Sequence, residues 1–195
     1  LVGNVALAVD PKASYVKVAA GDAKLWMAEK RAAAVLKEDD WEVKILVKVK
    51  GEALVNLEYE PLFPYMPLEG KKAHYIMPAS FVSLEDGSGI VHTAAVFGED
   101  DYNLGLEKDL PVVPLLDEKG HFNTDAPKMI QGQYFKESEQ TIKEDLEKRG
   151  LLFASEKHTH SYPHCWRCET QLYYNAISAW FINIQKIKPR LIELN

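Results

Sequence analysis

The sequence predicts an α+β domain in which a β-barrel or a strongly bent sheet carries peripheral helices. Three observations support this class. Short segments of alternating apolar residues recur along the chain, and such alternation is typical of half-buried strands. Turn-forming Gly, Pro and Asp residues separate most of these segments. Longer segments with helical apolar spacing are few, so helices are scattered among many short strands.

The first forty residues predict two paired strands and a helix. Residues 4–10 alternate apolar and small side chains, and we expect them to form a hairpin with a strand near residues 15–18, with Asp10 and Pro11 in the turn. Residues 22–37 predict an amphipathic helix with Asp22 as its N-cap. Its apolar face would consist of Leu25, Ala28, Ala32, Val35 and Leu36.

A strictly alternating stretch follows between residues 41 and 49. Its apolar positions are Trp41, Val43, Ile45, Val47 and Val49, which predict a half-buried strand. The lysines at positions 44, 48 and 50 would then lie together on the outward face. Such a face is ordinarily solvated, and the alternative is contact with the phosphates of a nucleic acid.

The remaining chain predicts short strands and two further helices. We expect a proline-rich turn at residues 61–67 and short strands at residues 73–77, 81–84 and 89–94. Residues 99–108 have helical character, and Asp117 to Gly120 predict a hairpin turn. A second amphipathic helix is expected from Tyr134 to Arg149, with Gly150 as its stop.

Composition and charge limit the classes of function. The chain has 195 residues and 47% apolar content, which suits one domain with a packed core, or one domain with an appendage. No apolar run approaches the roughly 18 residues of a membrane span. The net charge of −6 means that any nucleic acid must be held locally or by another part of a larger protein. The opening LVGNVALAVD and the closing FINIQKIKPRLIELN suggest a fragment of such a protein.

The stretch GSGIVHTAAVFGEDDY, residues 87–102, concentrates groups that can do chemistry. Its first two glycines permit a tight turn or a close approach by another backbone or a ligand. A strand then presents His92, and the Phe97-Gly98 pair can turn the chain back toward it, bringing Asp101 close. A carboxylate can hold an ammonium group, and an imidazole can shape the pocket beside it. The structural alternative is a strand followed by carboxylates that favour a helix N-terminus.

This stretch resembles the GxGIVHxAPAFGxxD signature of the editing domain of isoleucyl-tRNA synthetases, which are class I aminoacyl-tRNA synthetases. Three further segments resemble parts of the same domain in the same order: LVGNVALAVDP, LVNLEYEPLFPY and HSYPHCWRCETQLYYNAISAWFINI. The chain departs from the family at Ala95, where proline is usual, and at Asn56, where glycine is usual. The family's threonine-rich motif would lie just before Leu1.

The resemblance implies a proofreading hydrolase with the valyl/leucyl/isoleucyl type of editing fold. Residues 1–157 would form the editing domain, and residues 158–195 the exit ribbon and the return to the catalytic body. Asp101 would bind the α-ammonium of a misattached valine, while His92 would line the side-chain pocket and exclude isoleucine. Thr93 and Phe97 would complete the substrate-binding set around this catalytic pair. Water would be the nucleophile, since no Ser-His-Asp or Cys-His arrangement is evident.

The resemblance also implies the partners and cofactors. The partners would be the 3′ end of tRNA(Ile), valine or valyl-adenylate, and the rest of the parent synthetase, with no membrane contact. The editing reaction needs no cofactor, whereas ATP and Mg would serve the parent's catalytic domain. A cytoplasmic location is expected, consistent with a reducing compartment for two cysteines that form one CxxC.

The CxxC, from Cys165 to Cys168, is half of a zinc knuckle. Structural zinc needs four ligands. The histidines at positions 158, 160 and 164 could supply the others, although their spacing is not a standard one. The structural alternative is two free thiols at the base of a β-ribbon. The resemblance implies that a second cysteine pair lies outside this chain, so we expect no ordered zinc in this chain alone.

Two other functions remain open from the sequence. The first is the editing domain of valyl-tRNA synthetase, which removes threonine and usually has lysine where this chain has His92. The second is a noncatalytic RNA-binding or zinc-ribbon module, which would predict a basic surface and a complete set of zinc ligands.

Overall fold

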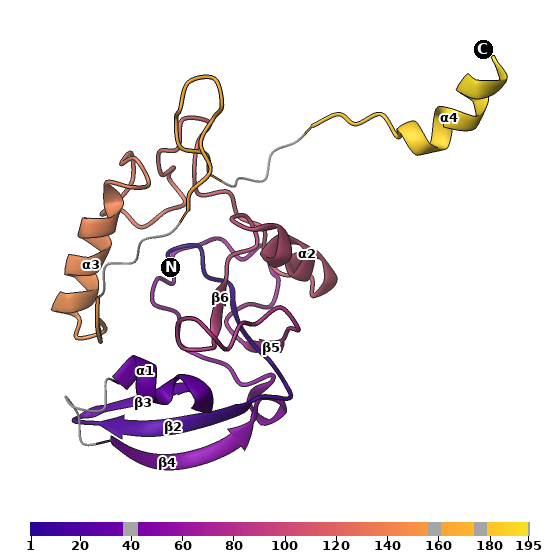
Figure 1. Cartoon of the computed structure of the whole chain (residues 1–195). Helices are drawn as coiled ribbons and strands as arrows, with labels where there is room; N and C mark the ends of the chain where they lie inside the picture. The colour runs from indigo at the N-terminus through magenta and orange to yellow at the C-terminus, as the bar shows by residue number, and fades with distance from the viewer. Residues whose placement is uncertain (37–42, 156–160, 174–178, 195) are drawn as a thin grey trace.

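The computed structural model describes residues 1–36, 43–155, 161–173 and 179–194. Two separate three-stranded sheets and several short helices make up the described chain (Figure 1). The elements in chain order are β1 (Ala6–Val9), β2 (Ser14–Ala20), β3 (Ala23–Ala28), the 3₁₀ helix η1 (Glu29–Arg31), α1 (Ala32–Leu36), β4 (Val43–Lys50), the 3₁₀ helix η2 (Gly51–Leu54), β5 (Ile76–Pro78), β6 (Val91–Thr93), α2 (Glu99–Glu107), α3 (Ser138–Lys148) and α4 (Ile184–Glu193).

The first sheet has the order β5-β1-β6 and carries the centre of the molecule. Strand β1 lies in the middle, parallel to β5 and antiparallel to β6. Ala6, Ala8 and Val9 of β1 are fully buried. The largest apolar cluster packs on this sheet and includes residues as far along the chain as Ile130 and Leu146. This burial fixes the position of β6 and of the loop that follows it.

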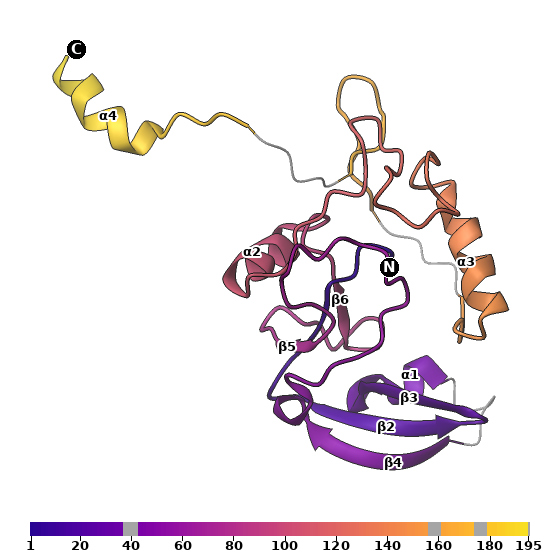
Figure 2. The same ribbon diagram turned by 180° about the vertical axis from the view of Figure 1, so that it is seen from behind.

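The second sheet has the order β3-β2-β4, and all its pairings are antiparallel. A tight turn at Gly21, which has a φ of 57°, joins β2 to β3. Helix α1 covers one face of the sheet, where Val16, Val18 and Met27 pack against Leu36. The sheet lies at one end of the molecule, and the two views of it agree (Figures 1 and 2).

A bulge divides β4 into two halves that face opposite ways. Lys17 pairs with Val47, but the next residue, Val18, pairs with Ile45, so Leu46 has no partner on β2. An extra residue reverses the alternation of side chains beyond it. Lys48 and Lys50 therefore share one face of the sheet, whereas Lys44 lies on the other. The alternating strand is confirmed over residues 43–50, but the expectation of a single lysine face is wrong. Trp41 lies outside the described residues.

A buried tyrosine joins the two sheets. The Tyr15 hydroxyl donates a hydrogen bond to the Gly89 carbonyl at 2.9 Å and accepts one from the Asp10 N–H at 3.0 Å. The Ala28 N–H donates to the Ser88 carbonyl at 2.8 Å. At Gly89, φ is +71° and an added Cβ would lie 2.5 Å from the Ala28 Cβ. The predicted close approach of a glycine to another backbone is therefore confirmed here.

The predicted helix over residues 22–37 is wrong for most of its length. Residues 23–28 form β3, and only residues 29–36 are helical, as η1 and α1. Asp22 lies in the β2–β3 turn and caps no helix. Alternation is present in AKLWMA, because Leu25 and Met27 face the α1 side and Trp26 faces away. Pairing with β2 therefore prevails over the helical propensity of alanine, leucine and methionine.

Three further expectations about strands are corrected. Strands β1 and β2 do not form a hairpin, because the turn at Asp10 to Ala13 carries the chain from one sheet to the other. Residues 81–84 form no strand, since Phe81 ends a turn and the next three residues are irregular. Among the described residues the strands make two open sheets, and no closed barrel joins them. The α+β class holds, with β5 and β6 confirmed as shorter strands than expected.

The predicted helices after residue 98 are largely confirmed. Helix α2 occupies the expected residues, while α3 begins at Ser138 because residues 134–137 form a turn. Gly150, with φ of 66°, ends α3 in a Schellman motif, since the Leu151 N–H donates to the Leu146 carbonyl. Helix α4 lies away from the sheets (Figures 1 and 2). Among the described residues, no helix is long and apolar enough to cross a bilayer.

We predict that Tyr15→Phe destabilises the protein by about 1–3 kcal/mol, because it leaves a buried carbonyl and an N–H without their partner. Urea unfolding of the 195-residue chain measures the change. Tyr65→Phe is the matched control, since Tyr65 is 63% exposed. Equal stability of the two variants would show that the Tyr15 hydroxyl does not hold the sheets together.

Candidate functional site

Strand β6 presents His92 and Thr93 on opposite faces. His92 pairs with Leu7 and Thr93 with Ala6 across the antiparallel ladder. Ala6 is fully buried, and Thr93 is likewise inaccessible, so its side chain points into the core. Successive side chains of a strand alternate between faces. His92 therefore points away from the core, where its side chain is exposed.

The loop of residues 94–98 connects β6 to α2 and is closely packed on both sides. Ala95 is buried against α2, where a Cβ added to Gly105 would lie 2.8 Å from the Ala95 Cβ. The Phe97 ring lies on the chain at Gly3, where an added Cβ would lie 2.9 Å from the ring. The Phe97 N–H also donates to the Ala94 carbonyl at 3.0 Å. These contacts restrict the path of the backbone between His92 and α2.

Asp101 lies in the first turn of α2 and points back toward this loop. Its carboxylate oxygen would lie 3.2 Å from a Cβ at Gly98, the N-cap of the helix. Burial raises the pKa of the Asp101 carboxyl above its ordinary value, and the charge of Asp100 adds to the rise. A hydrogen bond from the Ala94 N–H opposes both effects. The Asp101 carboxyl therefore faces the loop that follows His92.

His92 is held in its neutral form. Desolvation by the surrounding protein lowers the pKa of its imidazole. The side chain is nevertheless exposed, so enough protein lies beside the ring to displace water without covering it. A neutral ring can contact a substrate hydroxyl or limit the size of a side chain, and it adds no positive charge to repel an ammonium group.

A polar cluster that the sequence did not reveal fixes the start of β1 against the end of β6. The Asn4 side chain is buried and donates to the Ala6 carbonyl at 2.6 Å. The Tyr59 hydroxyl donates to the Asn4 carbonyl oxygen at 2.5 Å, and burial raises the pKa of Tyr59 strongly. The Thr93 hydroxyl is buried without a hydrogen-bond partner in the described part of the chain. Tyr59 belongs to the EYEPLF segment, so the motif was visible but its contact with Asn4 was not.

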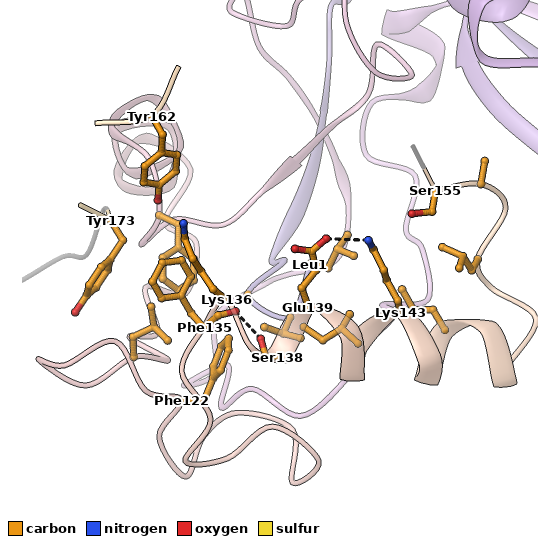
Figure 3. A pocket seen from close by; sticks show the side chains of 18 residues that line it. Leu1, Phe122, Phe135, Lys136, Ser138, Glu139, Lys143, Ser155, Tyr162 and Tyr173 are labelled. Carbon is orange, nitrogen blue, oxygen red and sulfur yellow. Dashed lines mark hydrogen bonds and ion pairs between the residues drawn. The ribbon is translucent and has the colours of Figure 1, made fainter. Parts of the chain in front are cut away.

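A cleft of about 760 Å³ lies between the start of the chain, α3 and the ribbon of residues 161–173 (Figure 3). Its walls are mostly apolar and aromatic, including Phe122, Phe135, Tyr162 and Tyr173. Its charged groups are Glu139 and Lys143, which form an ion pair of 2.8 Å, and Lys136, whose ammonium lies 4.8 Å from the centre of the Tyr162 ring. Phe97 is the member of the predicted set that lines this cleft.

The structure therefore brings some of the predicted site residues together and separates others. His92 and Asp101 flank one short packed loop, and Phe97 lies within that loop. The Thr93 side chain lies on the buried face of β6, opposite His92. Only the Thr93 backbone therefore lies near His92. Whether His92 and Asp101 bind one ligand stays a prediction.

Comparison with curated proteins finds similarity along the whole chain. The whole chain is 42% identical over 195 residues to the isoleucine–tRNA ligase of Clostridium novyi, and it spans 18% of that protein's length. The chain is related over its full length to isoleucine–tRNA ligases. It spans less than a fifth of the length of the curated relatives that it matches. A scan against protein-family models found no match.

Solved structures of synthetase editing domains share the fold of this chain. One, titled "The crystal structure of GlLeuRS-CP1", has a TM-score of 0.59 at 16% identity, over 80% of each chain. Another is the P. falciparum cytosolic leucyl-tRNA synthetase editing domain, with a TM-score of 0.55 at 17% identity over 76% of this chain and 72% of that one. The chain thus shares the fold of these leucyl-tRNA synthetase domains, without a closed barrel among the described residues.

The CxxC of this chain lies in the turn of a short β-ribbon. His164 pairs with Gln171, and the Cys165 N–H donates to the Thr170 carbonyl at 2.8 Å. Hydrogen bonds from the Thr170 side chain and backbone, and then from Cys165, lower the pKa of the exposed Cys168 thiol. In the described part of the chain, no group of three or more metal-binding side chains comes together. His158 and His160 lie outside the described residues, so the cysteines supply two of the four ligands that zinc needs.

We predict that Gly105→Ala lowers stability even though alanine favours a helix over glycine by about 1 kcal/mol. Its Cβ would collide with Ala95, and such overpacking costs about 1–3 kcal/mol. Asn103→Ala, at an exposed position of the same helix, is the control and should not destabilise the protein. Thermal unfolding of both variants tests the contact, and a stabilised Gly105→Ala would mean that the loop is not packed on α2 as described.

Proposed function

We propose that this chain is the editing module of an isoleucine–tRNA ligase and hydrolyses valine that has been joined wrongly to tRNA(Ile) or to AMP. The observation that carries the proposal is similarity along the whole chain to these ligases, together with the placement of His92 and Asp101 at the two ends of one packed loop. The parent enzyme would join isoleucine to its tRNA with ATP and Mg, outside this segment.

Such a module is needed because a synthetic site cannot reject a smaller amino acid well. One missing methylene changes binding by about 1–3 kcal/mol, a general range for which this class of synthetase is itself the standard illustration. A second site that admits valine and excludes isoleucine removes the error by hydrolysis. The editing site must therefore be too small for the larger side chain.

In this proposal Asp101 holds the α-ammonium of the valyl group. An ionised carboxylate and an ammonium form a charge-assisted hydrogen bond, which is stronger than a neutral one. The Ala94 N–H keeps the carboxylate oriented, and the partial burial of Asp101 strengthens the attraction. The ester carbonyl is thereby fixed relative to the loop, where an ordered water can attack it.

His92 limits the size of the side-chain pocket. Water adds to the carbonyl carbon, the bond from that carbon to the ribose oxygen breaks, and that oxygen takes up a proton as valine leaves. No nucleophilic side chain of this chain takes part, and rate comes mainly from positioning. Phe97 and the backbone of Thr93 border the same region. No cofactor enters the reaction, and zinc at Cys165 and Cys168 would need further ligands.

The partners in this proposal are the 3′ end of tRNA(Ile) and the rest of the parent synthetase, in the cytoplasm. A threonine-removing site of the valyl-tRNA synthetase type is less well supported, because a neutral imidazole stands where that enzyme usually has lysine. A noncatalytic module is also less well supported, because the similarity along the whole chain is to ligases.

We predict that Asp101→Asn in the full-length ligase abolishes hydrolysis of valyl-tRNA while leaving aminoacylation nearly intact. Asparagine can still accept the Ala94 hydrogen bond but cannot pair with an ammonium group. Asp100→Asn, an exposed neighbour, is the control. Deacylation at the wild-type rate by Asp101→Asn would remove this residue from the site.

The raised pKa of Asp101 adds a stability test on the 195-residue chain. A carboxyl whose folded-state pKa exceeds its unfolded value destabilises the fold as pH rises from about 3.8 through the folded pKa. Asp101→Asn should therefore melt at a slightly higher temperature than the wild type near pH 7, and this advantage should vanish in acid. A lower melting temperature at pH 7 would contradict this electrostatic cost.

We predict that His92→Ala in the full-length ligase gains hydrolysis of correctly charged isoleucyl-tRNA. Loss of a general base would instead cost about 10²–10⁴-fold in rate for every substrate. His92→Gln, which keeps most of the bulk, should retain the exclusion of isoleucine. Single-turnover deacylation of both charged tRNAs separates these cases, and a uniform collapse without gain for isoleucine would make His92 catalytic.

A further inference from the structure

The bulge in β4 assembles a basic surface on one face of the second sheet. Across the ladders, Ala19 of β2 pairs with Lys24 of β3 on one side and with Lys44 of β4 on the other. In the adjacent row, Lys17 lies between Trp26 and Val47. Three strands thus place three lysines on one face, around a small alanine.

The basic surface is open, and among the described residues no carboxylate forms an ion pair with its lysines. Lys24 and Lys44 are exposed and stand two strands apart, so their Cα atoms are separated by about 10 Å. The Lys17 ammonium lies 6.0 Å from the centre of the half-buried Trp26 ring. No described carboxylate pairs with these lysines, and the paired positions of this face carry none: Tyr15, Lys17, Ala19, Lys24, Trp26, Ala28, Lys44, Val47 and Val49.

The opposite face has lysines that are already engaged. Lys48 forms an ion pair of 2.6 Å with Glu29, and the Lys50 ammonium donates to the Lys12 carbonyl at 3.1 Å. Helix α1 also covers much of that face. The two faces therefore differ in the availability of their positive charge, although β4 contributes lysines to both.

We propose that the face formed by Lys17, Lys24, Lys44 and Trp26 is an RNA-binding surface that contacts the phosphate backbone. The RNA would be the tRNA of the proposed function, and in that respect the inference rests on it. Lysine ammonium groups neutralise phosphates and release their counterions, which supplies most of the sequence-independent affinity for nucleic acids.

Charge complementarity favours a polyanion as the occupant. The chain as a whole has a net charge of −6, so RNA would be repelled by most of its surface and attracted where lysines gather without carboxylates. The side chain of Ala19, between Lys24 and Lys44, is small, so a phosphate has room to approach both ammonium groups. The half-buried Trp26 ring adds an aromatic group of the kind on which nucleic acid bases stack.

Two double variants with equal loss of charge test the surface. Lys24→Gln with Lys44→Gln removes charge from the basic surface, and Lys48→Gln with Lys50→Gln removes it from the other face. Binding of the 195-residue chain to a fluorescently labelled, uncharged tRNA(Ile) transcript is measured by anisotropy between about 50 and 200 mM salt. Circular dichroism confirms that each variant is folded.

We expect the first double variant to bind more weakly and to lower the slope of log K against log salt by about two, roughly one per lysine. The second should keep the wild-type slope. Equal effects of both variants, or no binding by the unmodified chain, would overturn the proposal. So would competition by polyglutamate as strong as that by an RNA of equal charge, which would point to an acidic protein.

This binding experiment does not depend on hydrolysis. If the slopes separate as expected while the full-length ligase fails to deacylate valyl-tRNA, the RNA surface stands and the editing function falls. If deacylation proceeds but the two double variants bind alike, the editing function stands and the RNA surface falls.

Discussion

The geometry of the site depends on how closely the loop of residues 94–98 lies against its neighbours. Gly3 and Gly105 have no side chains, so Phe97 and Ala95 can approach their backbones directly. This close packing determines where the loop leaves β6 and where it enters α2. His92 lies just before the loop and Asp101 just after it, so the path of the loop determines their relative position. Steric limits at two glycines thus do more to define the site than any single polar contact.

The same arrangement carries an electrostatic cost. Asp101 is turned toward the loop, where burial disfavours its ionised form and only the Ala94 N–H compensates. A site that binds an ammonium group needs the ionised form, so stability is given up where function requires charge. His92 has the opposite tendency, because desolvation keeps it neutral. For the proposed function, the pair offers one negative charge beside an uncharged ring, which suits a small aliphatic amino acid.

Local sequence patterns correctly predicted the elements whose secondary structure is not changed by contacts with other elements. Strand β4, helix α2 and the end of α3 at Gly150 follow from alternation, helical spacing and a glycine stop. The failures arise from pairing between strands, which the pattern of one segment taken alone does not show. Pairing with β2 turns the helix-forming AKLWMA into a strand, and the Leu46 bulge splits a lysine pattern that looked uniform. The motif located His92 and Asp101, but not the Asn4–Tyr59 contact or the Ala94 N–H, because both depend on tertiary packing.

The central claim is that the packed loop makes His92 and Asp101 one site for a valyl group. NMR of the isotope-labelled chain, titrated with a non-hydrolysable 3′-valylamino analogue of the tRNA's terminal adenosine, tests it most directly. The account predicts that the His92 ring, the Asp101 carboxyl and the Ala94 N–H shift together along one saturable curve. The isoleucyl analogue should leave all three unchanged. Shifts confined to the cleft lined by Phe135 and Tyr162, or equal responses to both analogues, would contradict the account.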